Sequence, residues 1–169
     1  MQGLIHVYYG DGKGKTTAAI GLALRALGAG LRVTVVQFLK SRPSGEVQML
    51  RRLGAEVLRG QASEKFVFQM DEAERALTAR IHEENFRKAV ANGCDVLVLD
   101  EALSAVSVDV FSGETLLAFL REKPDGMEVV LTGHALMPEV EALADYITHM
   151  VCERHPYARG VGARKGIEY

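Results

Sequence analysis

The chain has 169 residues, of which 48% are hydrophobic and 25% charged, and its formal net charge is −2. This length suits one α/β domain with a core covered on both faces and is too short for two domains of usual size, so we expect residues 1–169 to form a single domain. The balanced charge argues against the basic surface of a protein that binds nucleic acid through its phosphates, and the composition argues against a disordered chain.

Cysteine usage and the start of the chain indicate the compartment. Cys94 and Cys152 are far apart and neither belongs to a Cys-x-x-Cys pair, so we expect two buried thiols in a reducing compartment rather than a zinc site or a disulfide. The sequence lacks the charged start and long apolar stretch of a signal peptide, and no segment approaches the ~20 apolar residues of a membrane span. We therefore expect a cytoplasmic protein without a membrane partner.

Short apolar runs alternate with longer stretches that have helical character. The runs predict β-strands at residues 4–9, 32–38, 95–99, 128–132 and 146–152. Helical spacing and capping residues predict helices at about 16–29, 71–92, 112–121 and 138–144. This order predicts an α/β fold, a three-layer, doubly wound, mostly parallel sheet whose ligand site lies at the carboxyl ends of the strands. Residues 39–70 are less regular, and we interpret them as a flap over the substrate.

A glycine-rich loop follows the first predicted strand and leads directly into an alanine-rich helix. Glycine leaves backbone N–H groups accessible to a polyphosphate, and the amino terminus of the helix adds partial positive charge. We expect Lys15 to lie along the phosphate oxygens and Thr16 to offer its hydroxyl to Mg²⁺ or Mn²⁺. The loop therefore predicts an ATP site in a P-loop NTPase-like, RecA-like fold. Its predicted nucleotide contacts are Gly10, Asp11, Gly12, Lys13, Gly14, Lys15, Thr16 and Thr17.

Two acidic residues, Asp100 and Glu101, come directly after the apolar run Val96-Leu97-Val98-Leu99. At the carboxyl end of a buried strand they can reach a metal bound to the phosphates, so together with Thr16 they are our predicted metal ligands. Taken alone, the pair is equally well explained as a helix cap or as two solvated carboxylates. The phosphate loop in the same chain favours the metal site.

Binding of ATP does not define a reaction, because kinases, hydrolases and transferases share such loops. Several segments, in the same order, resemble the P-loop corrinoid adenosyltransferases, which act on cob(I)alamin or cob(I)yrinic acid a,c-diamide. These segments are residues 7–19, 37–40, 98–101, 131–133, 144–145 and 155–169. The first glycine of the loop, Gly10, comes one residue later than in the general phosphate-loop pattern, with Tyr9 ahead of it, and the family loop begins late in the same way. The resemblance implies transfer of the 5′-deoxyadenosyl group of ATP to Co(I) of a reduced corrinoid in cobalamin biosynthesis or salvage, with release of triphosphate.

The same resemblance assigns residues to roles. It implies that Lys15, Thr16 and Glu101 are catalytic because they stabilise charge on the leaving triphosphate, since Co(I) needs no general base. It also implies that Phe66 and Phe68 press against the lower face of the corrin. On pattern alone, such a pair is more often one face of a strand.

Further nucleotide contacts implied by the resemblance are Asp11, Arg25 and His134, the last at a position where the family usually has arginine. Arg25 is equally well explained as a solvated helix residue. Expected partners are the small molecules ATP and corrinoid, a flavin-type electron-donor protein and a second copy of the chain in a homodimer, with no nucleic acid. Two alternatives stay open, namely a P-loop hydrolase or small-molecule kinase and a nucleotide- or corrinoid-binding module without turnover. Analysis of the reaction product distinguishes them.

Overall fold

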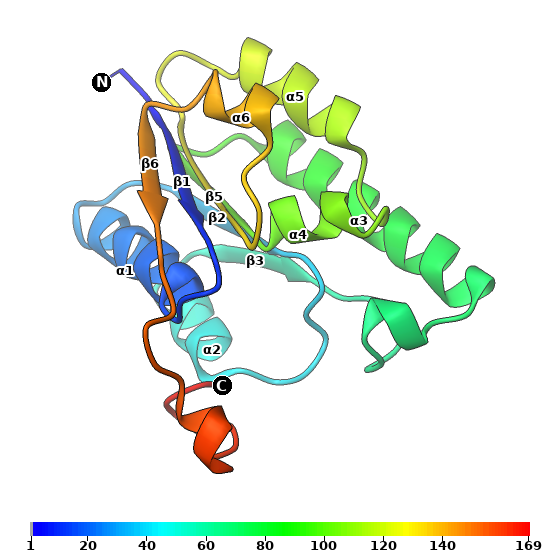
Figure 1. Cartoon of the computed structure of the whole chain (residues 1–169). Helices are drawn as coiled ribbons and strands as arrows, with labels where there is room; N and C mark the ends of the chain where they lie inside the picture. The colour runs from blue at the N-terminus through cyan, green and yellow to red at the C-terminus, as the bar shows by residue number, and fades with distance from the viewer. Residues whose placement is uncertain (1) are drawn as a thin grey trace.

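A computed structural model describes residues 2–169. It contains a six-stranded sheet in the order β3-β2-β4-β5-β1-β6 (Figure 1). The strands are β1 (Ile5–Tyr9), β2 (Val33–Gln37), β3 (Glu56–Arg59), β4 (Val96–Asp100), β5 (Glu128–Gly133) and β6 (Tyr146–His149). Every pairing between neighbouring strands is parallel. The carboxyl ends of all six strands therefore lie at one edge of the sheet, where α/β proteins bind their ligands.

Helices cover both faces of this sheet. They are α1 (Lys15–Gly28), α2 (Gly45–Arg52), α3 (Glu72–Asn92), α4 (Ala102–Ser107), α5 (Gly113–Glu122) and α6 (Pro138–Glu141), with 3₁₀ turns η1 (Val67–Gln69) and η2 (Pro156–Arg159). Helices α1 and α2 lie on one face, and α3 to α6 lie on the other (Figure 1). The predicted three-layer α/β architecture is thus confirmed.

Strand β4 shows how the sequence builds this arrangement. Val96 and Val98 pack into the core beneath α1 and α2, whereas Leu97 and Leu99 pack into the core on the opposite face. Because successive side chains of a strand point to opposite faces, a strand covered on both sides needs an unbroken apolar run. The short run at 96–99 therefore identified a central strand correctly.

Several short elements were not predicted. The irregular segment 39–70 contains α2, with eight residues, and the edge strand β3, with four, while α4 adds six residues directly after Glu101. Elements this short carry too few residues for a helical or alternating pattern to stand out. The last strand is also shorter than expected, because β6 ends at His149 rather than at residue 152.

The structure also bears on the expectations about environment. Both cysteines are free, and Cys94 is buried as expected. Cys152 is exposed, because the chain after β6 leaves the sheet, so the expectation of two buried thiols is wrong for that residue. Within residues 2–169 no helix has the length and apolar character needed to cross a membrane.

Candidate active site

A cavity of about 940 Å³ lies at the carboxyl edge of the sheet. Segments far apart in the sequence line it, namely the start of α1, residues 39–46, parts of 59–68, residues that follow β4 and β5, and the last residues of the chain. This volume is in the range of small-molecule sites. Six of the predicted site residues line the cavity: Thr16, Thr17, Phe66, Phe68, Glu101 and His134.

The glycine loop is shaped by its packing against the segment that follows β6. A Cβ atom on Gly12 would lie 2.7 Å from the backbone carbon and oxygen of Met150, and one on Gly10 would lie 2.5 Å from the same oxygen. The Gly12 N–H donates to Met150 O (2.7 Å), and the Gly10 N–H donates to His134 O (3.0 Å). These two N–H groups thus hold the loop itself. Gly14, at φ 121°, completes the turn into α1.

Lys15 curls back over this loop at the start of α1. Its side chain is nearly buried, and its Nζ donates to Gly12 O at 2.9 Å. Among the described residues, no side chain caps the amino terminus of α1, where Gly14 is the N-cap residue. The first N–H groups of a helix lack partners within the helix, so this end can bind an anion next to the Lys15 ammonium.

Two other polar residues of the loop, Lys13 and Asp11, contact residues outside the loop. Lys13 Nζ lies 2.8 Å from Glu168 Oε1, so it ties the loop to the carboxyl-terminal residues. Together, Arg164 and Lys13 lower the pKa of Glu168 to about 2. Asp11 is exposed, and its Oδ1 lies 3.5 Å from His134 Nδ1 at the rim of the cavity.

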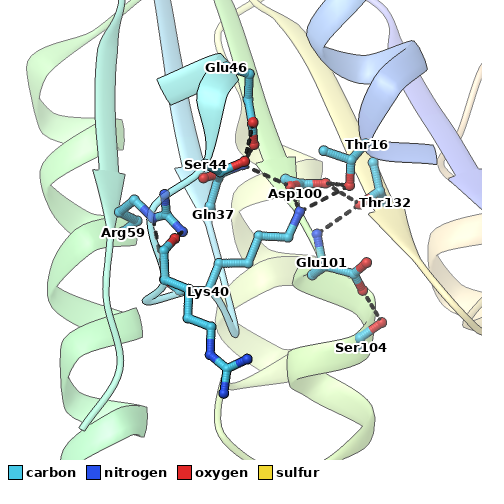
Figure 2. Close-up of polar contacts among 11 residues, drawn as sticks. Thr16, Gln37, Lys40, Ser44, Glu46, Arg59, Asp100, Glu101, Ser104 and Thr132 are labelled. Carbon is cyan, nitrogen blue, oxygen red and sulfur yellow. Dashed lines mark hydrogen bonds and ion pairs between the residues drawn. The ribbon is translucent and has the colours of Figure 1, made fainter. Parts of the chain in front are cut away.

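A buried carboxylate, Asp100, organises the centre of the site (Figure 2). Its Oδ1 accepts hydrogen bonds from Thr16 Oγ1 and Thr132 Oγ1, both at 2.8 Å. Its Oδ2 accepts from Lys40 Nζ at 2.5 Å and from Gln37 Nε2 at 3.3 Å. A buried charge is tolerated when it is paired and hydrogen-bonded in this way. Asp100 therefore connects the ends of four neighbouring elements, α1, β2, β4 and β5.

Glu101 follows in a left-handed backbone conformation, at φ 63°. This conformation is costly for a residue with a Cβ, by roughly 1–2 kcal/mol, and persists where neighbours enforce it. Here the Glu101 N–H donates to Thr132 Oγ1 at 2.8 Å, and the Glu101 carboxylate accepts from Ser104 Oγ at 2.6 Å (Figure 2). The result is a carboxylate fixed at the wall of the cavity.

The oxygen atoms of Thr16, Asp100 and Glu101 match the ligands that Mg²⁺ prefers. Within residues 2–169 no three His, Cys, Asp or Glu side chains gather closely enough to hold a metal by themselves. A divalent cation here would thus take its remaining ligands from phosphate oxygens and water, as Mg²⁺ commonly does in nucleotide sites. The chain's donor set fits a metal that arrives with a nucleotide.

Lys40, Glu46, Arg59 and Thr132 complete the polar side of the site, although no role had been predicted for them. Glu46 Oε1 accepts from Gln37 Nε2 at 3.2 Å, and Ser44 Oγ also donates to the Glu46 carboxylate (Figure 2). Burial tends to raise the pKa of Glu46, but hydrogen bonds from Ser44, its own backbone and Gln37 outweigh it, so the pKa is lowered. Lys40 follows the predicted strand 32–38 and Thr132 ends the predicted strand 128–132, and that position was the available signal for these two. Glu46 and Arg59 lie in the segment 39–70, which carried no such signal.

Phe66, the N-cap residue of the turn η1, and Phe68, within that turn, line the cavity. Their rings stack with centroids 5.6 Å apart and planes 4° from parallel, yet they are 66% and 82% exposed. The alternative that they form one face of a strand is wrong, because the segment is a 3₁₀ turn whose first residue, Val67, is the buried one. The cavity therefore has one flat aromatic wall.

Arg25 is not brought to this site. It lies in the last turn of α1, about 15 Å along the helix axis from Lys15 at 1.5 Å per residue, and its side chain is exposed. Its position agrees with our alternative interpretation, that Arg25 is a solvated helix residue.

A comparison with known protein families identifies the chain. The profile of the family described as ATP:corrinoid adenosyltransferase BtuR/CobO/CobP matches residues 1–169. The chain belongs to this family. The resemblance seen in the sequence is thus confirmed, and the reaction that it implied, adenosyl transfer from ATP to a corrinoid, is the reaction of the family.

Individual corrinoid adenosyltransferases are similar over almost the whole chain. The corrinoid adenosyltransferase of Escherichia coli and that of Salmonella typhimurium are each 34% identical over 99% of this chain and 86% of their own length. The Pseudomonas aeruginosa relative is 32% identical over 99% of this chain and 84% of its own. The solved Xyl-CE4 domain of a multidomain xylanase, from the hindgut metagenome of Trinervitermes trinervoides, aligns over 100% of this chain and 96% of its own. Its identity is 13% and its TM-score 0.30, too weak a likeness for any argument.

Proposed function

We propose that this corrinoid adenosyltransferase family member transfers the 5′-deoxyadenosyl group of ATP to Co(I) of a reduced corrinoid and releases triphosphate. The observation that carries the proposal is that Thr16, at the end of the phosphate loop, and the stacked Phe66 and Phe68 line one cavity. One wall thus suits a charged polyphosphate and another suits a flat macrocycle. In this proposal residues 1–169 act as one domain that carries both substrate sites.

At the phosphate end, the residues act by position and charge. Co(I) is a strong nucleophile, so the protein must align the 5′ carbon and stabilise the leaving triphosphate, without a general base. Lys15 and the amino terminus of α1 would hold the phosphate oxygens. A Mg²⁺ or Mn²⁺ ion on Thr16, Asp100 and Glu101 would supply further positive charge against the leaving group. His134, at the rim, would add a weaker, pH-dependent contact.

At the corrin end, we assign binding to the two exposed phenylalanines. Burying two aromatic faces against a macrocycle removes apolar surface from water, which is worth roughly 1.5–3 kcal/mol for each side chain that becomes fully buried. Pressed against the lower face of the corrin, Phe66 and Phe68 would displace the axial ligand, so that Co(II) becomes easier to reduce. A flavin-type electron-donor protein would supply that electron. A homodimeric state and a cytoplasmic location complete the proposal, and both follow from the family resemblance and the sequence.

Product analysis tests the proposal. The purified protein is incubated with MgATP and a chemically reduced corrinoid, and we expect a light-sensitive cobalt–carbon product together with triphosphate in equal amounts. Formation of ADP or inorganic phosphate instead would favour the hydrolase or kinase alternative. Tight binding of both substrates without product would favour a module that does not turn over.

A further inference from the structure

Lys40 touches the same two groups that a divalent cation would use. Its Nζ lies 2.5 Å from Asp100 Oδ2 and 3.1 Å from Thr16 Oγ1 (Figure 2). The hydroxyl proton of Thr16 is already donated to Asp100 Oδ1, so Lys40 binds a lone pair of the Thr16 oxygen. A metal coordinated by Thr16 and Asp100 would have to lie beside the same two oxygens, so the ammonium and the metal compete for one place.

The backbone after β2 directs Lys40 to this position. The Phe38 N–H donates to Asp100 O at 2.9 Å, and Leu39 then adopts φ 56°. The Leu39 N–H donates to Nε2 of the buried His82 at 3.2 Å, which fixes this unusual conformation. The next side chain, that of Lys40, is therefore turned back along the edge of the sheet toward Asp100.

The Lys40 side chain also has room to move away from Asp100 into the cavity. Its side chain is 27% exposed and lines the cavity, whereas the Asp100 side chain is fully buried behind it. Two cations about 4 Å apart repel each other by roughly 1 kcal/mol or more per pair of unit charges, and more in a poorly solvated site. The site cannot hold both the ammonium and a divalent ion against the same oxygens at low cost.

We propose that Lys40 is a placeholder cation for the metal site. It neutralises the buried Asp100 until a divalent cation binds at Thr16 and Asp100, and it then moves into the cavity, where its charge can reach the phosphates that accompany the metal. This inference rests on the metal site of the proposed function. It predicts that the metal alone binds weakly, because it must displace an ion pair, and that nucleotide strengthens metal binding.

Titration with Mn²⁺ without nucleotide, followed by the EPR signal of the free ion, tests the idea. Lys40→Met should bind Mn²⁺ about tenfold more tightly than the unaltered protein, because the competing charge is gone. Lys65→Met is the matched control, because Lys65 lies on the same cavity, paired with Glu74, and its loss changes the net charge equally. For that variant we expect a change within about twofold.

Thermal unfolding gives a readout that is independent of turnover. In the absence of metal, Lys40→Met should unfold at a lower temperature than the unaltered protein, because Asp100 loses its ion pair. Mn²⁺ should reduce this difference in unfolding temperature. Should Lys40→Met not fold, Lys40→Gln, which keeps a neutral donor to Asp100, replaces it. The placeholder role would be overturned if the variant bound Mn²⁺ equally well or more weakly than the unaltered protein. It would also be overturned if metal left the difference in unfolding temperature unchanged. Absence of Mn²⁺ binding to every protein, with and without ATP, would refute the metal site itself.

Discussion

Thr132 Oγ1 donates to Asp100 Oδ1 and accepts from the Glu101 N–H, and both distances are 2.8 Å. One buried hydroxyl on β5 thus fixes two consecutive carboxylate residues at the end of β4. The register of these strands places Thr132 just beyond the pair formed by Leu99 and Leu131. The geometry of the candidate metal site therefore depends on a residue that is itself outside the cavity.

Thr132→Val preserves the shape of this side chain but removes the hydroxyl. Asp100 would lose a donor and the Glu101 N–H would lose its acceptor, so we expect the free energy of unfolding to fall by about 1–3 kcal/mol. Urea unfolding measures this loss. Thr132→Ser, which keeps the hydroxyl, should retain most of the stability and most of the metal-dependent ATP binding. Equal losses in the two variants would show that the hydroxyl does not carry the effect.

Replacing Gly12 tests the packing of the phosphate loop. A Cβ on Gly12 would collide with the Met150 backbone, so Gly12→Ala should displace the loop and weaken ATP binding by tenfold or more, an estimate that corresponds to about 1.4 kcal/mol. Gly21→Ala is the control, because Gly21 lies inside α1 and no atom of the described chain beyond its own helix lies within 4 Å of where the new methyl carbon would be. That change should leave ATP binding intact and stabilise the helix by about 0.5–1 kcal/mol. Calorimetric titration with MgATP decides between the two outcomes.

The two walls of the cavity should be separable by mutation. Lys15→Ala removes the ammonium at the loop and should abolish ATP binding, whereas Phe68→Ala should spare ATP and impair the use of Co(II) corrinoid. Calorimetry with MgATP and the optical spectrum of bound Co(II) corrinoid measure the two effects. If both variants lost ATP binding alike, the division of the cavity into a phosphate end and a corrin end would be wrong.

His82 should make stability depend on pH. It is buried, its Nδ1–H donates to Val110 O, and its Nε2 accepts from the Leu39 N–H, so it is neutral. Burial lowers its pKa below the ordinary 6.5, and the backbone groups of Val110 and Gly60, which favour the protonated ring, oppose this only in part. As the pH falls below about 6.5, the unfolded chain gains a proton before the folded protein does, so stability decreases through that window.

His82→Gln removes this ionisation, and urea unfolding at pH 7.5 and 5.5 measures its contribution. The variant should be less stable than the unaltered protein at neutral pH but should lose less stability on acidification. Histidines elsewhere in the chain act equally in both proteins and cancel in the comparison. A pH dependence that is the same with and without His82 would contradict the assignment.

The sequence predicted the features that depend on neighbours along the chain. The loop from Gly10 to Thr16, the apolar run of β4 and the acidic residues after that run are all local patterns, and the loop and the acidic residues lie at the predicted edge of the sheet. The contacts of Asp100 with Lys40 and Thr132 depend instead on β2 and β5 flanking β4. The order of strands in a parallel sheet is set by crossover packing and is not written in any one segment.

Arg25 illustrates a limit of assigning residue roles from a family resemblance. The resemblance suggested a nucleotide contact, but a residue in the last turn of a straight helix that begins at Lys15 is carried far from that helix's first turn. Helical geometry alone could have favoured the solvated alternative. Phe66 and Phe68 are the opposite case, because the 3₁₀ turn that begins at Val67, with Val67 buried, stacks the two rings against each other.

The position of the last residues has a practical consequence for handling this protein. Gly166, Glu168 and Tyr169 line the cavity, and the amino-terminal end of β1 lies at the opposite edge of the sheet (Figure 1). An affinity tag fused after Tyr169 would begin at the wall of this cavity, where it would obstruct access and strain the contact of Glu168 with Lys13. A tag at the amino terminus would project from the far side, so purified material intended for kinetics is better tagged there.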